Sequence, residues 1–195
     1  MERSICLVHF NKTPGGIELL LPGIIRSFSS REFHIFVIRP SEGPSVYENL
    51  DCEITFGSRS NSKAIWRLIR FARQNKRSVF HLFNVGPLFL LTIRLAGVSR
   101  VVYSIRGTVY WHNRVESVVL KSIWRMAIDS GRHIFTSNSE YSGNVFNENI
   151  DSKVNCRLLY NYCDSGRFKI KAESEDPRGT SKIIYVGRLT AGKGL

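Results

Sequence analysis

The chain has 195 residues, which is enough for one sizeable domain and part of a second. Its hydrophobic content of 43% is ordinary for a globular core, whereas its net charge of +12 is high and indicates an anionic partner: nucleic acid, a phosphorylated substrate or an acidic membrane surface. The most apolar window, from Pro87 to Val98, contains Arg94, which excludes a bilayer-spanning segment there.

The start of the chain and its cysteines indicate a cytosolic protein. Only six apolar-leaning residues follow Met1 to Ser4, which is too few for the apolar region of a signal peptide and favours a first strand. The cysteines have neither Cys-x-x-Cys spacing nor clustered histidines beside them. We therefore expect free thiols in a reducing compartment at Cys6, Cys52, Cys156 and Cys163.

Apolar runs alternate with amphipathic segments along the chain. Six strands are expected, at residues 5–10, 33–38, 78–83, 100–105, 133–136 and 158–160. Helical segments are expected at residues 17–28, 61–77 (with Asn61 or Ser62 as the cap), 87–96, 115–128 and 140–147, while residues 46–56 are ambiguous. The alternation predicts an α/β protein with a doubly wound, mostly parallel, Rossmann-like sheet and right-handed crossovers.

The composition changes near the end of the chain. Residues 165–181 are rich in charged and small residues, which is typical of a linker between domains. We expect a first domain at 1–164, a linker at 165–181 and the start of a second, incomplete domain at 182–195.

The expected helix at 61–77 has a strongly basic face. On a helical projection its cations share one arc with Trp66, and the apolar side chains occupy the opposite arc. The basic arc consists of Lys63, Arg67, Arg70, Arg73 and Arg77. An aromatic ring among cations is suited to a membrane interface or to a phosphorylated, lipid-linked substrate. The alternative is a solvated helix face whose tryptophan covers a neighbouring loop.

A glycine-rich turn, Gly15-Gly16-Ile17-Glu18, follows the first expected strand. It lies at the carboxyl end of that strand, where open α/β sheets bind ligands, and paired glycines let the backbone approach a phosphate closely. The turn does not have the Gly-x-Gly-x-x-Gly pattern, so a nicotinamide dinucleotide site is not supported. A plain tight turn is the alternative.

A second turn, residues 185–195, carries Arg188 and Lys193 directly after an apolar run. Backbone amides and two cations in such a turn are suited to a diphosphate. The turn nearly matches a Walker A loop, but Gly194 stands where Ser or Thr would hold Mg²⁺. The alternative is an ordinary basic turn.

Three further segments complete a pattern with these two turns. They are Arg106-Gly107, residues 135–142 (Phe-Thr-Ser-Asn-Ser-Glu-Tyr-Ser) and residues 159–164 (Leu-Tyr-Asn-Tyr-Cys-Asp). In this order the five segments resemble the retaining GT-B glycosyltransferases, specifically the family 4 group that builds bacterial surface polysaccharides such as lipopolysaccharide. Arg106 occupies the place of the family's usual histidine, and residues 159–164 resemble the segment that ends its acceptor domain.

The resemblance implies transfer of a sugar from a nucleotide diphosphate donor, without a metal, to a polysaccharide or lipid-linked acceptor. Arg188, Lys193 and the Gly15-Gly16 amides would neutralise the leaving diphosphate. Arg106 would act near the transferred sugar; because it is charged and donates only, it would hold a phosphate or an acidic sugar. Its alternative role is an ion pair at the edge of the core. The enzyme would be peripheral, at the inner face of the cytoplasmic membrane.

The resemblance covers only the first half of such an enzyme. The family's second domain carries a Glu-x₇-Glu segment for the donor, and this sequence stops before it. We therefore expect the isolated chain to be inactive, whether it is a fragment, a disrupted gene product or one half of a split enzyme completed by a separate chain.

Other sites and function classes have weaker support. His9 and His81 are expected to be core or sheet-edge histidines, with His9 facing the acceptor as the alternative, and neither has metal-ligand spacing. The net charge would also suit a basic nucleic-acid-binding module, but no RNA-binding signature is present and no specific nucleic acid is expected. A P-loop nucleotidase is the weakest alternative.

Overall fold

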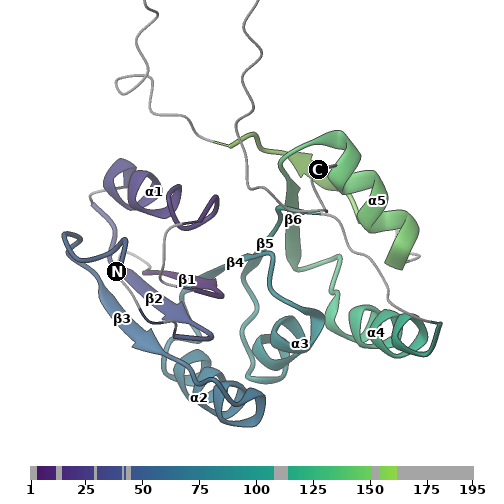
Figure 1. Ribbon diagram of the computed structural model, residues 1–195, viewed down its shortest axis with the longest axis horizontal. Helices are drawn as coiled ribbons and strands as arrows, with labels where there is room; N and C mark the ends of the chain where they lie inside the picture. Colours follow the sequence, from purple (N-terminus) through teal and green to yellow (C-terminus); the bar gives the residue numbers. More distant parts are fainter. Residues whose placement is uncertain are drawn as a thin grey trace, which may run out of the picture. The chain divides into compact units, whose positions relative to one another are not determined.

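Within the described residues, seven parallel strands form one sheet in the computed structural model, which describes residues 4–11, 15–28, 30–40, 42, 45–107, 114–150 and 154–161 (Figure 1). The strands are β1 (Ile5–His9), β2 (Phe33–Val37), β3 (Glu53–Phe56), β4 (Val79–Phe83), β5 (Val101–Ile105), β6 (His133–Ser137) and β7 (Cys156–Leu158). Their order is β3-β2-β1-β4-β5-β6-β7, with every neighbouring pair parallel. The doubly wound, Rossmann-like α/β fold expected from the sequence is confirmed.

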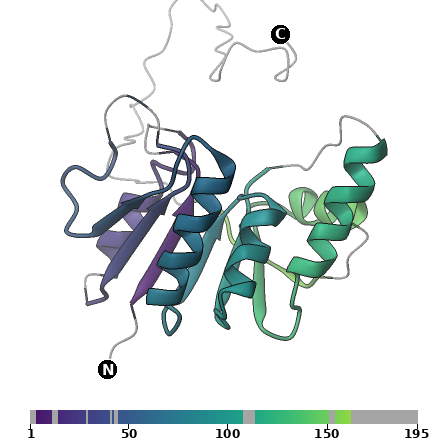
Figure 2. The same cartoon turned by 90° about the horizontal axis from the view of Figure 1, so that it is seen from below.

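The described helices are divided between the two faces of the sheet. They are α1 (Leu21–Ser27), α2 (Asn61–Gln74), α3 (Pro87–Leu95), α4 (Arg114–Ala127) and α5 (Glu140–Ile150). Figure 1 shows α1 on one face and α2, α3 and α4 on the other, and Figure 2 shows these three side by side. The chain winds from β1 outward to β3, returns through α2 to β4, and then continues to β7. The reversal makes the β1–β4 boundary the topological switch point of the sheet.

Alternate residues of the strands enter two separate cores. In β1, Cys6 and Val8 pack with the core under α2, α3, α4 and α5, whereas Leu7 packs with the core under α1. A strand buried on both faces reads as a near-continuous apolar run, which is why the sequence marks β1 so clearly.

The ambiguous residues 46–56 contain a strand that the sequence analysis did not assign. Tyr47 lies in a turn and is buried in the core under α1, and β3 follows at the edge of the sheet. Both end residues of β3, Glu53 and Phe56, are exposed, so the strand lacks the apolar run that marks the central strands.

Several element boundaries also differ from the expected ones. Helix α1 begins only at Leu21, because Pro22 fits the first turn of a helix and not its interior. The cap of α2 is Ser60, with no side-chain capping bond, and not Asn61 or Ser62. The last strand spans Cys156–Leu158, so it ends two residues before the end of the expected segment 158–160.

All described residues belong to a compact unit that spans residues 1–162. The expected linker, the expected start of a second domain and Cys163 lie outside the described residues. Cys6, Cys52 and Cys156 are free, as expected, and burial raises the pKa of the Cys6 thiol to about 12. No helix in the described ranges is long and apolar enough to span a bilayer.

Candidate functional site

The carboxyl edge of the sheet gathers polar residues from four neighbouring strands. The first residue after β4 is Asn84, the first after β5 is Arg106 and the first after β6 is Asn138, while Asn161 lies shortly after β7. We call these four residues the carboxyl-edge cluster. Because β4, β5, β6 and β7 are consecutive in the sheet, their carboxyl ends lie next to one another, beside the switch point.

Arg106 forms hydrogen bonds with two other residues of the cluster, Asn84 and Asn161. Its backbone N–H donates to Asn84 Oδ1 at 3.3 Å, and its Nη1 donates to the Leu159 carbonyl at 3.5 Å and to Asn161 Oδ1. Its Nε is buried and has no hydrogen-bond partner. Burial lowers the pKa of the guanidinium, and no carboxylate of the described residues forms an ion pair with it. The alternative role, an ion pair at the core edge, has no partner among the described residues and is not tested beyond them.

Asn84 adopts a backbone conformation that few residues tolerate. Its φ of +49° lies in the left-handed region, which asparagine enters more easily than most other residues. Its side chain lies close to the exit of β5, since a Cβ added to Gly107 would be in van der Waals contact with Asn84 Nδ2, at 3.5 Å. The Asn84 amide is thus held against the backbone that follows β5.

A chain of polar side chains lies within the sheet beneath the cluster. His81 Nε2 lies 2.7 Å from Ser104 Oγ, which shares a 2.7 Å hydrogen bond with Thr136 Oγ1. Ser104 is the last residue but one of β5, and Arg106 directly follows the strand. Burial, followed by the charge of Arg106, lowers the pKa of His81 to about 3. His81 is therefore a neutral, satisfied sheet histidine, as expected.

His9 lies at the end of β1 and is completely buried. Its Nε2 lies 2.7 Å from the Tyr47 hydroxyl, while its Nδ1 lies 3.6 Å from Glu18 Oε1 and has no hydrogen-bond partner. Burial acts to raise the pKa of Glu18, but the interactions with His9 and with a backbone N–H outweigh it and lower this pKa. His9 is thus a buried histidine, as expected, and its contact with the acceptor stays a prediction.

The glycine turn after β1 packs around Glu18. A Cβ at Gly15 would clash with the Glu18 carboxylate, whereas a Cβ at Gly16 would meet nothing within 4 Å. The carboxylate of the turn itself therefore explains the first glycine. Contact of this turn with a donor diphosphate stays a prediction.

The basic face of α2 is exposed, and among its cations Arg67 is engaged with backbone carbonyls. Trp66 is 62% exposed and so does not cover a neighbouring loop. Arg67 Nη1 donates to the carbonyls of Phe56 and Gly57, at 3.2 and 2.7 Å, and thus holds α2 against the exit of β3. A shallow pocket of about 470 Å³ is lined by Trp66, Ile69, Arg70, Arg73 and Gln74. Lys63 is exposed at the start of the helix.

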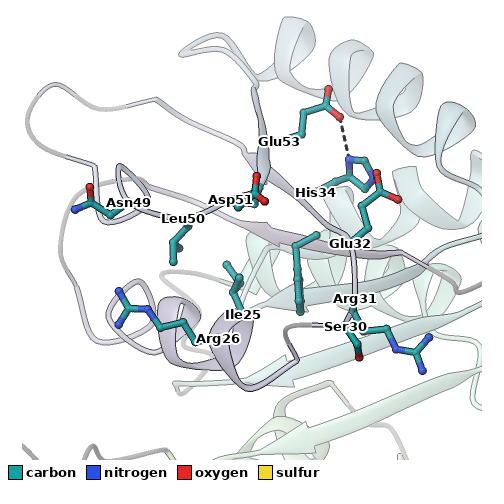
Figure 3. A pocket seen from close by; sticks show the side chains of 12 residues that line it. Ile25, Arg26, Ser30, Arg31, Glu32, His34, Asn49, Leu50, Asp51 and Glu53 are labelled. Atoms are coloured by element: carbon teal, nitrogen blue, oxygen red, sulfur yellow. Dashed lines mark hydrogen bonds and ion pairs between the residues drawn. The ribbon is translucent and has the colours of Figure 1, made fainter.

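A pocket of about 630 Å³ lies at the opposite, amino edge of β2 and β3 (Figure 3). In it His34 lies between two carboxylates, with Nδ1 3.0 Å from Glu53 and Nε2 3.4 Å from Glu32. Ligands of open α/β sheets bind at the carboxyl edge, so this pocket is not the candidate site. No group of three metal-ligating side chains occurs among the residues that the structure describes.

Two of the predicted diphosphate ligands, Arg188 and Lys193, lie outside the described residues. The structure adds Asn84, Asn138 and Tyr47, which were not singled out from the sequence. For the two asparagines a signal existed, because each is the first polar residue after an apolar strand. Tyr47 carried no such signal, since it is separated from His9 by 38 residues.

The fold is similar to that of solved structures. No protein-family model and no curated protein sequence matches the chain. The structure of Anabaena Alr3699/HepE in complex with UDP-glucose aligns with a TM-score of 0.65 at 15% identity, over 86% of this chain and 46% of that chain. Its complex with UDP and glucose aligns with a TM-score of 0.65 at 14% identity, over 87% and 47% of the respective chains.

The chain therefore spans about half the length of the solved structures that it matches. At this identity the similarity establishes the fold alone, over about half of each of those chains.

Proposed function

We propose that the chain is the acceptor-binding half of a retaining, family 4-type GT-B glycosyltransferase. The enzyme transfers a sugar from a nucleotide diphosphate donor to a polysaccharide or lipid-linked acceptor in bacterial surface polysaccharide synthesis. The similarity to Alr3699/HepE, whose structures contain UDP-glucose, UDP, or UDP and glucose, supports a nucleotide sugar as the donor.

The observation that carries the proposal is the position of the unpaired polar atoms. Three buried side-chain atoms of the described residues have no hydrogen bond: His9 Nδ1, which faces Glu18 Oε1 at 3.6 Å, and Arg106 Nε and Asn138 Oδ1, which have no polar partner among these residues. All three belong to residues that end a strand or directly follow one at the carboxyl edge. Each such atom costs about 1–3 kcal/mol, so a fold keeps them together where a ligand supplies the missing partners.

The proposed chemistry is electrostatic. The bond between the anomeric carbon of the donor sugar and the diphosphate breaks, and negative charge accumulates on the leaving diphosphate. Arg188, Lys193 and the amides of Gly15 and Gly16 neutralise this charge, a role that the proposal assigns to the chain and not to a metal ion. Arg106 contacts the transferred sugar.

A transfer assay tests the proposal. The full-length gene product is incubated with a panel of nucleotide sugars and a lipid extract, with and without cell extract that can supply a missing domain. We expect release of the nucleoside diphosphate and a product that keeps the anomeric configuration of the donor by NMR. Arg106→Gln should lower the transfer rate, whereas Arg100→Gln, which removes a cation before β5 and not after it, should not. Absence of transfer with every donor would refute the proposal.

We also propose that the enzyme is peripheral to an acidic membrane through α2. The exposed ring of Trp66 lies beside Arg70 and Arg73 around a shallow pocket, and an amphipathic aromatic ring among cations is suited to the lipid headgroup region. In cosedimentation, vesicles with acidic lipids should retain the protein. A double change of Arg70 and Arg73 to Glu should abolish retention, while Arg100→Glu should not. Equal retention by neutral vesicles would contradict the proposal.

A further inference from the structure

Arg106 is a partly buried cation that has no counter-ion among the described residues. Burial lowers the pKa of its guanidinium, and no carboxylate of the described residues forms an ion pair with it to offset that burial. The exposed Arg59, in contrast, pairs with Glu42 at 2.7 Å. Taking a charge out of water without a partner is costly, so this position is one where an external anion stabilises the protein.

The contacts of Arg106 leave one edge of the guanidinium, which includes the buried Nε, without a hydrogen-bond partner among the described residues. Nη1 donates to Leu159 and Asn161, whereas Nε has no partner and Nη2 donates to none of the described residues. Nε and Nη2 are parallel donors, and this pair matches the two oxygens of a carboxylate.

The rest of the cluster is neutral and suited to hydroxyl groups. Asn84 has an exposed amide, and the buried Oδ1 of Asn138 is an acceptor that lacks a donor. His81 beneath them is neutral near pH 7, because its pKa is about 3. A ligand that satisfies this cluster combines one carboxylate with several hydroxyls. A diphosphate fits less well, because the cluster offers it a single cation.

We propose that the carboxyl-edge cluster binds the carboxylate of an acidic sugar, a hexuronate, with Arg106 as the specificity-determining residue. This inference rests on the proposed function and names its substrate class. The hexuronate is either the sugar of the donor or the terminal sugar of the acceptor, and both offer the same chemistry to Arg106.

A binding experiment tests the cluster without requiring transfer. Saturation-transfer NMR on the full chain compares glucuronate, glucose and inorganic phosphate at equal concentration. We expect a saturation-transfer signal for glucuronate and a much weaker one for glucose. Inorganic phosphate should displace bound glucuronate less effectively than added glucuronate does. Arg106→Gln should lower the affinity for glucuronate about 10- to 100-fold, as expected for loss of a charge-assisted bidentate pair. Arg106→Lys keeps the charge but not the two parallel donors, so its affinity for glucuronate should lie between those of the wild type and Arg106→Gln. Arg100→Gln should leave the affinity unchanged.

A transfer experiment then distinguishes the two sources of the carboxylate. UDP-glucuronate is compared with UDP-glucose as donor, and an acidic acceptor is compared with its carboxyl-reduced form. If Arg106→Gln lowers kcat/KM for only one of the two acidic substrates, the donor or the acceptor, that substrate carries the carboxylate that Arg106 binds. The inference would be overturned, while the proposed function stands, if the wild type had the same kcat/KM for neutral and acidic sugars and Arg106→Gln lowered both values equally. Binding of glucuronate without any transfer would support the cluster and overturn the proposed function. A thermal melt of each variant separates these outcomes from misfolding, which Arg106→Gln could cause through its lost bond to Asn161.

Discussion

Replacing His81 by glutamine tests the electrostatics beneath the carboxyl-edge cluster. His81 Nε2 lies 2.7 Å from Ser104 Oγ, and the amide nitrogen of glutamine can take the same position. The variant therefore keeps the hydrogen bond but removes a group that titrates. Burial, followed by the charge of Arg106, lowers the pKa of His81 from 6.5 to about 3.

The sign of the effect follows from proton binding. The unfolded chain takes up a proton at His81 near pH 6.5, whereas the folded chain does so only near pH 3. Between these values the unfolded state binds more protons, so the free energy of unfolding decreases as the pH falls. One pKa unit corresponds to about 1.4 kcal/mol, so His81 alone should lower the free energy of unfolding of the wild type by about 2 kcal/mol when the pH falls from 7 to 5.

Urea denaturation of both proteins at the two pH values measures this difference. Other groups titrate equally in both proteins, so the extra acid sensitivity of the wild type reports on His81. Histidine NMR on the folded wild type should show one imidazole that stays neutral at pH 5, and in Arg106→Gln its pKa should be higher. Equal acid sensitivity of the two proteins, or titration of His81 near pH 6.5, would refute the reasoning.

Two further changes test the packing around α2 and the first loops. Arg67→Ala should lower the free energy of unfolding by about 1 kcal/mol, since it removes two bonds to backbone carbonyls, while Arg70→Ala should change it by less than about 0.5 kcal/mol. Equal effects in urea denaturation would contradict the anchoring role of Arg67. Gly57→Ala should cost about 1–3 kcal/mol or more, because its Cβ would clash with a backbone carbonyl, whereas Gly16→Ala should be tolerated. Ile38, whose carbonyl lies against Gly57, directly follows β2, so a thermal melt that ranks the two glycines in the opposite order would contradict this close contact.

The sheet was predictable where its strands are buried on both faces. Strands β1, β4 and β5 read as apolar runs because each contributes to both cores or lies between covered neighbours. The edge strand β3 was not assigned, because the residues at its two ends are exposed and its place depends on pairing with β2. Long-range pairing of this kind leaves no periodic signal within a segment of four residues.

The candidate site was predictable only in part. Arg106 and the glycine turn could be chosen because they follow strands and resemble family segments. The partnership of His9 with Tyr47 could not, because it joins residues far apart in the chain and depends on the turn before β3. Likewise, the sequence placed Arg67 with the other cations of α2, and only the position of the β3 exit reveals that its guanidinium is held there.

The unpaired atoms at the carboxyl edge are the strongest physical sign of function in the described residues. Elsewhere in the sheet the buried polar side chains are satisfied, as in the His81, Ser104 and Thr136 chain. Arg106 Nε and Asn138 Oδ1, at about 1–3 kcal/mol each, amount to a substantial part of the 5–15 kcal/mol that typically stabilises a domain. Folding alone would favour the removal of such atoms, for example by an apolar residue at position 138. Their retention at the edge where parallel sheets bind ligands is best explained by a polar ligand that completes their hydrogen bonds.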